Sequence, residues 1–180
     1  MLAEQLLIRR AVADDVPAIT AIYAEHVLGG TASFDTVPRS EDATFARLEE
    51  CDKRGWPFIV AAIHDAVAGY AYVTQFRDRP AYQYSCENSI YLRGDHRGQG
   101  IGKVLLNRLV SAAEDSGFRQ MIAVSGGGEP ASVALHLACG FEMAGRMKSV
   151  GRKAGRWLDT VYLQKALGPG DGTAPESELK

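Results

Sequence analysis

The sequence has few cysteines, no excess of basic residues and no long apolar run, and each of these absences excludes a class of protein. Its three cysteines are far apart and form no C-x-x-C pair, so neither a disulfide framework nor a metal site is expected. Twenty Lys and Arg stand against 22 Asp and Glu, a net charge of -2 that disfavours a nucleic-acid partner. No stretch approaches the roughly 18 apolar residues of a membrane span, and Met1–Arg10 lack the pattern of a signal peptide. The chain is therefore predicted to be cytoplasmic, with no membrane and no nucleic acid among its partners.

The chain has the length and composition of one folded domain. Its 180 residues, 46% of them hydrophobic and 23% charged, suffice for a single core but not for two full domains. Pro, Gly, Ser and charged residues dominate from Gly168 onward. We therefore expect a domain over residues 1–167 and a disordered tail over residues 168–180.

Hydrophobic periodicity predicts a mixed α/β order of elements. A helix is predicted over residues 15–28, and Ser40 is expected to cap a second helix that buries Phe45 and Leu48 and closes at Gly55. Two more helices are predicted, one carrying Val104, Leu105, Leu109, Val110 and Ala113, the other running from Pro130 to Gly140 with Val133, Ala134 and Leu137. Strands are predicted over residues 6–12, 57–63, 67–76, 82–92, 121–124, 141–150 and 157–163.

The strongest local signal is a glycine-rich turn between a predicted strand and a predicted helix, Arg97-Gly98-Gln99-Gly100-Ile101-Gly102-Lys103. Glycines let the backbone approach a ligand, and the first N–H groups of a helix are unpaired, so such a turn suits phosphate or pyrophosphate. A Walker A loop fails at Arg97 and Val104, and the G-x-G-x-x-G dinucleotide fingerprint is not matched. A turn that binds nothing is the alternative.

The residues of this turn resemble those of the GCN5-related N-acetyltransferases (GNAT). Arg97-x-x-Gly100-x-Gly102 matches that superfamily's R/Q-x-x-G-x-G/A signature, and the order of elements is similar. Five segments resemble, more narrowly, the phosphinothricin and methionine sulfone/sulfoximine acetyltransferases: residues 31–34 (TASF), 87–92 (ENSIYL), 131–136 (ASVALH), 140–141 (GF) and 155–160 (GRWLDT). The resemblance implies a single GNAT-type domain, with helices flanking a mostly antiparallel sheet whose two parallel strands splay apart at the cofactor site.

The resemblance also implies acetyl-CoA as co-substrate. Its pyrophosphate would lie on the N–H groups from Gly98 to Lys103, and its pantetheine arm would pair with the backbone of residues 90–92. The implied cofactor-binding residues are Ile90, Tyr91, Leu92, Arg97, Gly98, Gln99, Gly100, Ile101, Gly102, Lys103, Glu129 and Ser132. Glu129 departs from the family, which usually has Asn there, because a carboxylate can accept a hydrogen bond but cannot donate one.

Glu87 is the candidate base, since an amine must lose a proton before it attacks a thioester. Free α-amino groups titrate near about 7.7–8.0, and an apolar setting beside Cys86 would raise the pKa of the Glu87 carboxyl into a useful range. The resemblance assigns Glu87 the same role, acting through water; a solvated strand carboxylate is the alternative. His136, which relatives place near the sulfur, is expected either to protonate the departing thiolate or to have a structural role.

Arg77 and Arg79 precede Glu87 and are candidates for the acceptor's acidic group. Guanidinium groups suit bidentate binding of carboxylate or phosphinate, although a solvated loop is the ordinary reading of such a pair. Aromatic walls are expected from nearby residues. The candidate substrate-binding residues are Phe34, Arg77, Arg79, Tyr84 and Glu87, with Tyr82 as a further wall.

The leading hypothesis is an N-acetyltransferase that moves the acetyl group of acetyl-CoA to the α-amine of a small amino acid or analogue, of the phosphinothricin, methionine sulfone or sulfoximine type. The resemblance also implies a homodimer, in which residues 155–157 close the site from a second subunit. Two alternatives stay open: a protein or peptide N-terminal acetyltransferase, and a CoA-binding sensor module without turnover.

Overall fold

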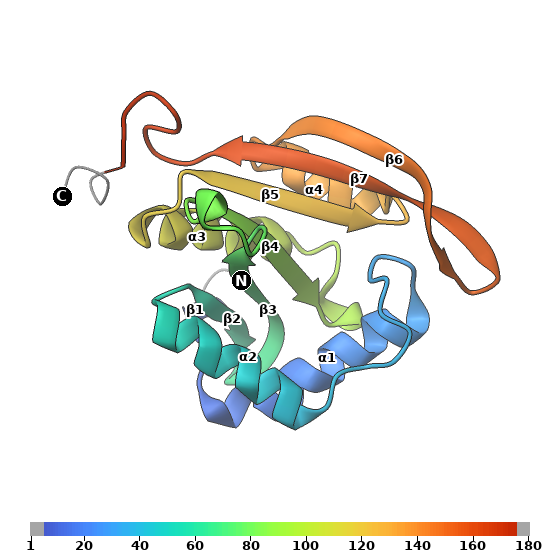
Figure 1. Cartoon of the computed structure of the whole chain (residues 1–180). Coiled ribbons are helices and arrows are strands. Elements are labelled where there is room, and N and C mark those ends of the chain that lie inside the picture. The colour runs from blue at the N-terminus through green and yellow to red at the C-terminus, as the bar shows by residue number, and fades with distance from the viewer. Residues whose placement is uncertain (1–5, 176–180) are drawn as a thin grey trace.

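The computed structural model describes residues 6–175, which form one seven-stranded sheet with helices on both faces (Figure 1). The strands are β1 (Leu6–Arg10), β2 (Phe58–Ile63), β3 (Ala66–Gln75), β4 (Ser85–Leu92), β5 (Gln120–Gly126), β6 (Glu142–Lys153) and β7 (Arg156–Ala166). The helices are α1 (Val16–Gly29), α2 (Glu41–Arg54), α3 (Ile101–Asp115) and α4 (Pro130–Ala138). Short 3-10 turns cover Ala13–Asp15, Pro80–Tyr82 and Gly94–His96.

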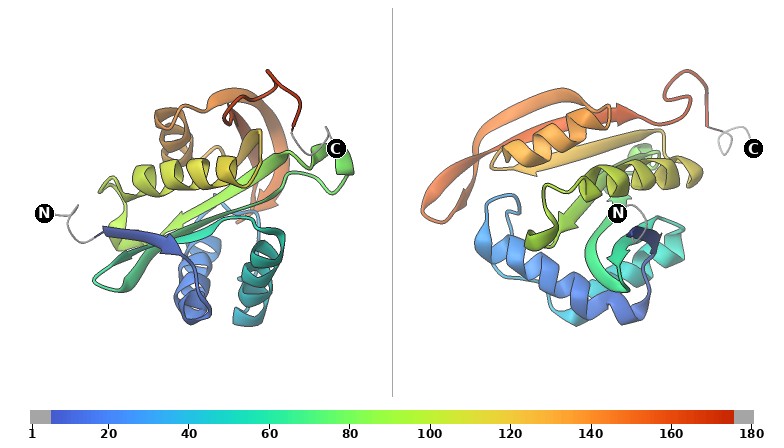
Figure 2. Two further views of the ribbon diagram at one scale, coloured as in Figure 1. Left: turned by 90° about the vertical axis from the view of Figure 1, so that its left-hand side faces the viewer. Right: turned by 180° about the vertical axis from the view of Figure 1, so that it is seen from behind.

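The sheet has the order β1-β2-β3-β4-β5-β7-β6, and every neighbouring pair is antiparallel except β4–β5. Helices α1 and α2 cover one face, and α3 and α4 cover the other (Figure 2). Each face has its own apolar core: Leu105, Leu106 and Leu109 of α3 lie in one, and Ile19, Ile22 and Val27 of α1 lie in the other. The expected single mixed α/β sheet flanked by helices is thereby confirmed.

The parallel pair is short. Only Ser85–Asn88 of β4 pair with Gln120–Ala123 of β5, although β4 continues to Leu92 and β5 to Gly126. Beyond Asn88 and Ala123 the two strands part, as the resemblance implied. We call the space between their separated ends the fork.

Helix α2 shows how the local signals work. Ser40 Oγ accepts a hydrogen bond from Ala43 N at 3.2 Å, and Gly55 ends the helix with a left-handed φ of +69°. The buried positions are Thr44, Leu48 and Cys51, whereas Phe45 is 42% exposed, so its expected burial was wrong. The buried residues recur at spacings of four and three along one face of the helix. Phe45 follows Thr44 by one residue, which rotates its side chain off that face and into solvent.

Other differences are shifts of boundary and face. The strand predicted from residue 82 begins at Ser85, because Pro80–Tyr82 form a 3-10 turn. Val104 and Leu137, expected on buried helix faces, are 49% and 46% exposed. The last two strands are longer than predicted, because residues 151–153 pair with residues 156–158 in the projecting hairpin and residues 164–166 pair with β5 (Figure 1).

After β7 the chain forms turns held by Arg119, whose Nη1 donates to Gly170 O and Thr173 Oγ1, each at 3.3 Å. A disordered tail from Gly168 stays a prediction, and residues 176–180 lie outside the described part. Within residues 6–175, no helix is both long and apolar enough to cross a membrane.

Candidate active site

Where β4 and β5 part, backbone groups of both strands face the fork. Phe76 N donates to Ser85 O and Arg93 N donates to Ala68 O, both at 2.9 Å, so the odd-numbered residues of β4 bond to β3. Because antiparallel bonding alternates, the even-numbered residues point toward β5, and past Asn88 these are Ile90 and Leu92. On β5, Leu167 N donates to Arg119 O, so the odd-numbered residues of β5 bond to β7. By the same alternation, the backbone N–H and C=O of Val124 point toward β4.

These groups form an open edge of the kind to which an extended amide chain can add. His26 Nε2 donates to Leu92 O at 2.8 Å, which leaves the Ile90 N–H and C=O and the Leu92 N–H as the groups of β4 at the fork. Tyr91, expected among them, directs its backbone to β3, and its ring packs edge-on to Tyr23 at 5.2 Å. Sequence reasoning did not find Val124, since only the register shows which way its backbone faces.

The glycine-rich turn lies between β4 and α3. Gly98 and Gly100 have left-handed φ angles of +73° and +83°, and Gly100 is the N-cap of α3. In the described part of the chain, the N–H groups of Gly98–Gly102 donate to no backbone acceptor outside the helix, and the first N–H groups of a helix have none within it. Lys103 N, expected to belong to this set, instead donates to Gly100 O at 3.1 Å. The turn thus offers an N-terminal array of N–H donors that suits a pyrophosphate.

The side chains of the turn are held to its surroundings. Arg97 Nη2 lies 3.3 Å from Glu25 Oε1 and 3.2 Å from His26 Nε2, and Gly94 N donates to Glu25 Oε2 at 3.3 Å. Gln99 Nε2 donates to the Asp95 carbonyl at 2.9 Å. Helix α1 therefore braces the turn, and part of the charge of Arg97 is engaged with Glu25.

Glu87 lies on the opposite face of β4 from Asn88, in register with Thr74 and Ile122. Its side chain is 33% exposed, and Arg77 Nη1 is 3.8 Å from Glu87 Oε2. Burial raises the pKa of the Glu87 carboxyl, and the nearby Arg77 guanidinium offsets part of this rise, so the pKa stays above its ordinary value. The site therefore holds a carboxyl group with a raised pKa, which makes its ionised form a stronger base than an ordinary carboxylate.

The structure brings Arg77 to Glu87 but leaves Arg79 on the exposed loop. The Arg77 guanidinium lies 4.0 Å above the centre of the Phe76 ring, and Tyr82 meets that ring edge-on at 5.8 Å. Tyr84, half-buried, comes just before β4, and its carbonyl accepts from Arg119 N at 2.8 Å.

Phe34 packs against two strand glycines on the Glu87 side of the sheet. Its ring lies where a Cβ on Gly126 of β5 or Gly151 of β6 would stand, at 2.9 Å and 2.2 Å. Lys153 Nζ donates to Ser33 O at 2.8 Å and ties the same loop to the β6–β7 hairpin (Figure 1). Sequence reasoning missed Gly126, Gly151 and Lys153; glycines inside strands were the available signal of a close approach.

His136 lies on α4 and is 3% exposed, on the side of β4 away from Glu87. Its Nδ1 is 2.8 Å from Ser132 O, and its Nε2 is 2.9 Å from Asn88 Nδ2. A carbonyl oxygen only accepts, so Nδ1 carries the proton and Nε2 accepts from the Asn88 amide. Burial lowers the pKa of the imidazole, which favours this neutral form. Asn88 was not among the predicted site residues.

Glu129 precedes α4, where its N–H donates to Gly126 O at 3.4 Å. Its carboxylate has no hydrogen bond or ion pair with another described residue, so it is available to a ligand at the start of α4. Residues 6–175 contain no cluster of three or more His, Cys, Asp or Glu placed to hold a metal ion.

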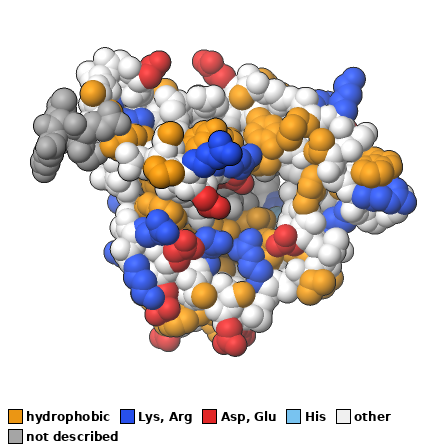
Figure 3. Space-filling view, viewed as in Figure 1, with side chains coloured by type: hydrophobic (Ala, Val, Ile, Leu, Met, Phe, Trp, Pro, Cys, Tyr) orange, Lys and Arg blue, Asp and Glu red, His pale blue; other side chains and the backbone are white. Residues whose placement is uncertain are grey.

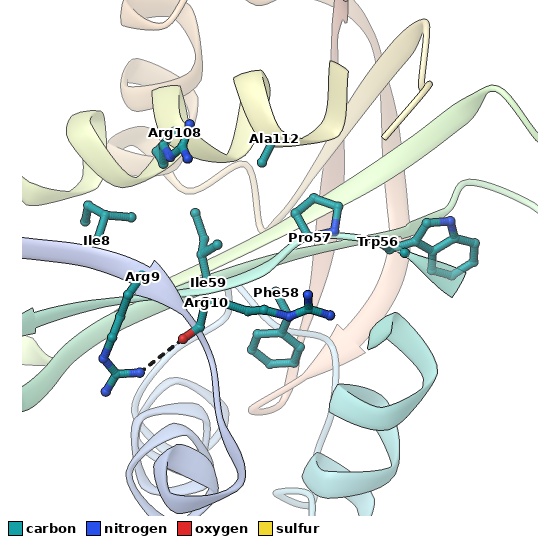
Figure 4. Close-up of a pocket in the computed structure, with 10 residues that line it drawn as sticks. Ile8, Arg9, Arg10, Trp56, Pro57, Phe58, Ile59, Arg108 and Ala112 are labelled. Atoms are coloured by element: carbon teal, nitrogen blue, oxygen red, sulfur yellow. Dashed lines mark hydrogen bonds between the residues drawn. The ribbon is translucent and has the colours of Figure 1, made fainter. Parts of the chain in front are cut away.

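Charges of both signs are interspersed over the face shown in Figure 3, in keeping with the small net charge. A separate cavity of about 230 Å³ lies between β1, β2 and α3 (Figure 4). Its Arg9 and Arg10 are paired with Asp15 at 2.7 Å and Asp52 at 2.6 Å. None of the predicted site residues lines this cavity, so it is not part of the Glu87 site.

Comparison with known proteins places this geometry in a family. Residues 8–162 match the family model "Acetyltransferase (GNAT) domain". Phosphinothricin N-acetyltransferase of Alcaligenes faecalis is 49% identical over 164 residues, which are 91% of this chain and 83% of that protein. The L-methionine sulfoximine/L-methionine sulfone acetyltransferase of Pseudomonas aeruginosa is 38% identical over 165 residues, 90% of this chain and 95% of that protein.

A solved structure supports the same family assignment. The GNAT superfamily phosphinothricin acetyltransferase from Sinorhizobium meliloti, crystallised in complex with AcCoA, has a TM-score of 0.92 and 49% identity, covering 95% of this chain and 93% of that one. The expected resemblance to phosphinothricin and methionine sulfoximine/sulfone acetyltransferases is thus confirmed. The chain belongs to the GNAT family of acetyltransferases.

Proposed function

We propose that this enzyme transfers the acetyl group of acetyl-CoA to the α-amine of a small amino acid or amino-acid analogue, of the phosphinothricin, methionine sulfone or methionine sulfoximine type. The observation that carries the proposal is the placement of Glu87, a half-buried carboxyl with a raised pKa beside Arg77, on the strand whose next residues form the fork. The names of the relatives support the same substrate class.

The residues present fit acetyl-CoA, which supplies an activated acetyl thioester when bound. The N–H groups of Gly98–Gly102 would hold the pyrophosphate, with Lys103 and the partly engaged Arg97 as positive support. The backbone of Ile90 and the N–H of Leu92 would hold the pantetheine arm by strand-like hydrogen bonds. Ser132 and Glu129 would contact the same arm from the start of α4.

Glu87 would accept a proton from the ammonium group of the acceptor, directly or through a water molecule. A carboxyl of ordinary pKa is a weak base toward an ammonium group, and burial narrows the difference in pKa that the transfer must overcome. The partial exposure of the side chain lets the proton reach solvent afterwards.

Arg77 would bind the acidic group of the acceptor, and Phe34 would cover its apolar side chain. Arg77 can do so because Glu87, at 3.8 Å, occupies only part of its hydrogen-bonding capacity. Arg79 and Tyr84 complete the proposed set from the loop before β4.

A thiol-release assay with acetyl-CoA tests the proposal directly, with phosphinothricin, methionine sulfone, methionine sulfoximine and the ordinary amino acids as acceptors. We expect rapid release with the three analogues and slow or no release with amines that lack an acidic group. Release with none of these acceptors would contradict the proposal.

A second candidate, peptide or protein N-terminal acetylation, is favoured by one solved neighbour. A structure from Brucella melitensis described as ribosomal-protein-alanine N-acetyltransferase is 38% identical with a TM-score of 0.86. A peptide acceptor added to the same assay separates the two, because Arg77 would bind a free carboxylate that a peptide lacks beside its α-amine. Tight acetyl-CoA binding without release from any acceptor would instead indicate a sensor module.

We further propose a homodimer that works in the cytoplasm. Strand β6 is an edge of the sheet, and its residues 142–150 are all exposed. A second subunit would cover this edge, and the hairpin residues 155–157 would approach the partner's site. The three cysteines are buried free thiols, which suit a reducing compartment.

A further inference from the structure

Two buried polar atoms on the α4 side of the fork have no hydrogen-bond partner among the described residues. They are Asn88 Oδ1 and Ser125 Oγ, on residues that are 7% and 4% exposed. Asn88 is the last residue of β4 that pairs with β5, opposite Ala123. Ser125 lies two residues beyond Ala123, so its side chain is on the same face of the sheet. The Asn88 side chain therefore stands on β4 where the fork begins, and the Ser125 side chain stands on the β5 arm just beyond that point.

The orientation of the Asn88 amide follows from its neighbour. Ser132 O requires the proton of His136 on Nδ1, so His136 Nε2 can only accept. The group 2.9 Å from Nε2 is therefore the NH₂ end of Asn88, and the oxygen end is directed elsewhere. Buried amide oxygens are nearly always hydrogen-bonded in native proteins, which makes this one a candidate for contact with a ligand.

The same bonds limit what His136 can do in acyl transfer. Its one proton is used by Ser132 O, and its lone pair is used by Asn88. Neither ring nitrogen has a proton free for a departing thiolate while these bonds last. The pair instead fixes the direction of the Asn88 oxygen.

We infer that Asn88 Oδ1 accepts a hydrogen bond from an amide N–H of the pantetheine arm, and that His136 is the positioning residue that aims the Asn88 amide. The inference rests on the proposed function, because it needs an acyl donor in the fork. An amide N–H is the fitting donor, since a thioester carries no S–H and an amide oxygen repels a thiolate. Ser125 Oγ, which can donate or accept, suits the C=O of the same kind of group.

Calorimetric titration with acetyl-CoA and with CoA tests the contact. Asn88→Leu keeps the approximate size of the side chain without its amide, and we expect the Kd for both ligands to rise about tenfold, the effect of one lost hydrogen bond. Asn107→Leu, at the chain's other asparagine on an exposed position of α3, is the matched control and should leave both Kd values unchanged. If Asn88→Leu weakens the binding of CoA but not of acetyl-CoA, the donor to Asn88 is the thiol. If the folded variant binds both ligands as tightly as wild type does, Asn88 does not contact them. Either result overturns the inference.

Two variants of His136 separate aiming from proton donation. Gln can still accept from Asn88 near the position of Nε2, whereas Leu cannot. We expect His136→Leu to raise the Kd for acetyl-CoA, and we expect the Kd of His136→Gln to stay close to that of wild type. If His136 is a proton donor, both variants will lower kcat and leave this Kd unchanged, which contradicts the inference.

Nitrogen-15 NMR of the wild-type imidazole gives a test that needs no variant. His136 should be neutral with its proton on Nδ1 at pH 7, before and after acetyl-CoA is added. A proton on Nε2, or a positively charged ring at neutral pH, would overturn the inference. If wild type fails to bind acetyl-CoA, the proposed function itself fails; if it binds and transfers while the tests above fail, only this inference is lost.

Discussion

Glu87 combines a raised pKa with a partly exposed side chain, and its proposed role as a base that releases its proton to solvent requires both properties. We expect Glu87→Gln to lower kcat at pH 7 by about 10²- to 10⁴-fold, the usual contribution of a positioned base. Its KM for acetyl-CoA should be unchanged, because the proposed cofactor contacts lie elsewhere on β4 and on α3. Steady-state thiol release measures both constants, and near-normal turnover in the variant would exclude Glu87 from catalysis.

The same substitution should stabilise the fold at neutral pH. The folded pKa of Glu87 lies above its unfolded value, so folding becomes less favourable as the pH rises through that interval and the buried carboxyl ionises. Gln carries no charge at any pH. The Tm of Glu87→Gln should therefore exceed that of wild type at pH 7, with the difference vanishing at acidic pH where Glu87 is protonated. A Tm difference independent of pH would contradict this account.

Arg77 acts on Glu87 through its charge. The guanidinium at 3.8 Å lowers the pKa of the carboxyl, so Arg77→Gln should raise that pKa and move the acidic limb of the kcat/KM profile to higher pH. The KM for the amine should also rise, about tenfold or more for a lost charged hydrogen bond. Arg79→Gln is the control, since Arg79 has no ion pair with Glu87, and it should leave the acidic limb in place.

At the scale of elements, the loop after α1 and the hairpin β6–β7 meet at a glycine. A Cβ on Gly151 would lie 2.2 Å from the Phe34 ring, so Gly151→Ala must displace that ring from the wall that we propose it forms in the acceptor site. We expect the KM for the amine to rise about tenfold, as for a lost apolar contact of one to two kcal/mol, while the KM for acetyl-CoA stays constant. Gly145→Ala, in the same strand with nothing within 4 Å of the new Cβ, should change neither constant. Equal effects of the two variants would show that Phe34 is not a wall.

At the scale of the whole molecule, an exposed sheet edge with apolar side chains needs a cover. Met143, Met147 and Val150 of β6 are 52%, 43% and 50% exposed. Light scattering should show a particle of twice the 19.4 kDa chain mass. Met147→Lys should shift it to the monomer, whereas Leu7→Lys, at an exposed position of β1 on the opposite edge, should not. A wild-type monomer at micromolar concentration would contradict the proposed dimer.

Many structural features of this protein depend on residues that are neighbours in the sequence, and the sequence alone predicted those features. The glycines of the glycine-rich turn, the Ser40 cap and the apolar strands are features in which a few neighbouring residues decide the backbone conformation. The family resemblance then correctly implied the splayed parallel pair and the acetyltransferase activity. The error at Phe45 has the same origin, because local periodicity gives the stripe of a helix but not which edge of that stripe the neighbouring element covers.

The assembly of the site depends instead on contacts between segments that are distant in the sequence. The pairing of Asn88 with His136 joins residues 48 positions apart, and Phe34 meets Gly151 across 117 positions, 151 minus 34. The direction of the Ile90 and Val124 backbones depends on the register with neighbouring strands, and the pKa of Glu87 depends on burial by those strands. Such contacts form only when segments distant in the sequence pack together. The sequence therefore identified the chemical groups of the site, whereas the folded sheet set the distances between them, their protonation and their hydrogen-bond partners.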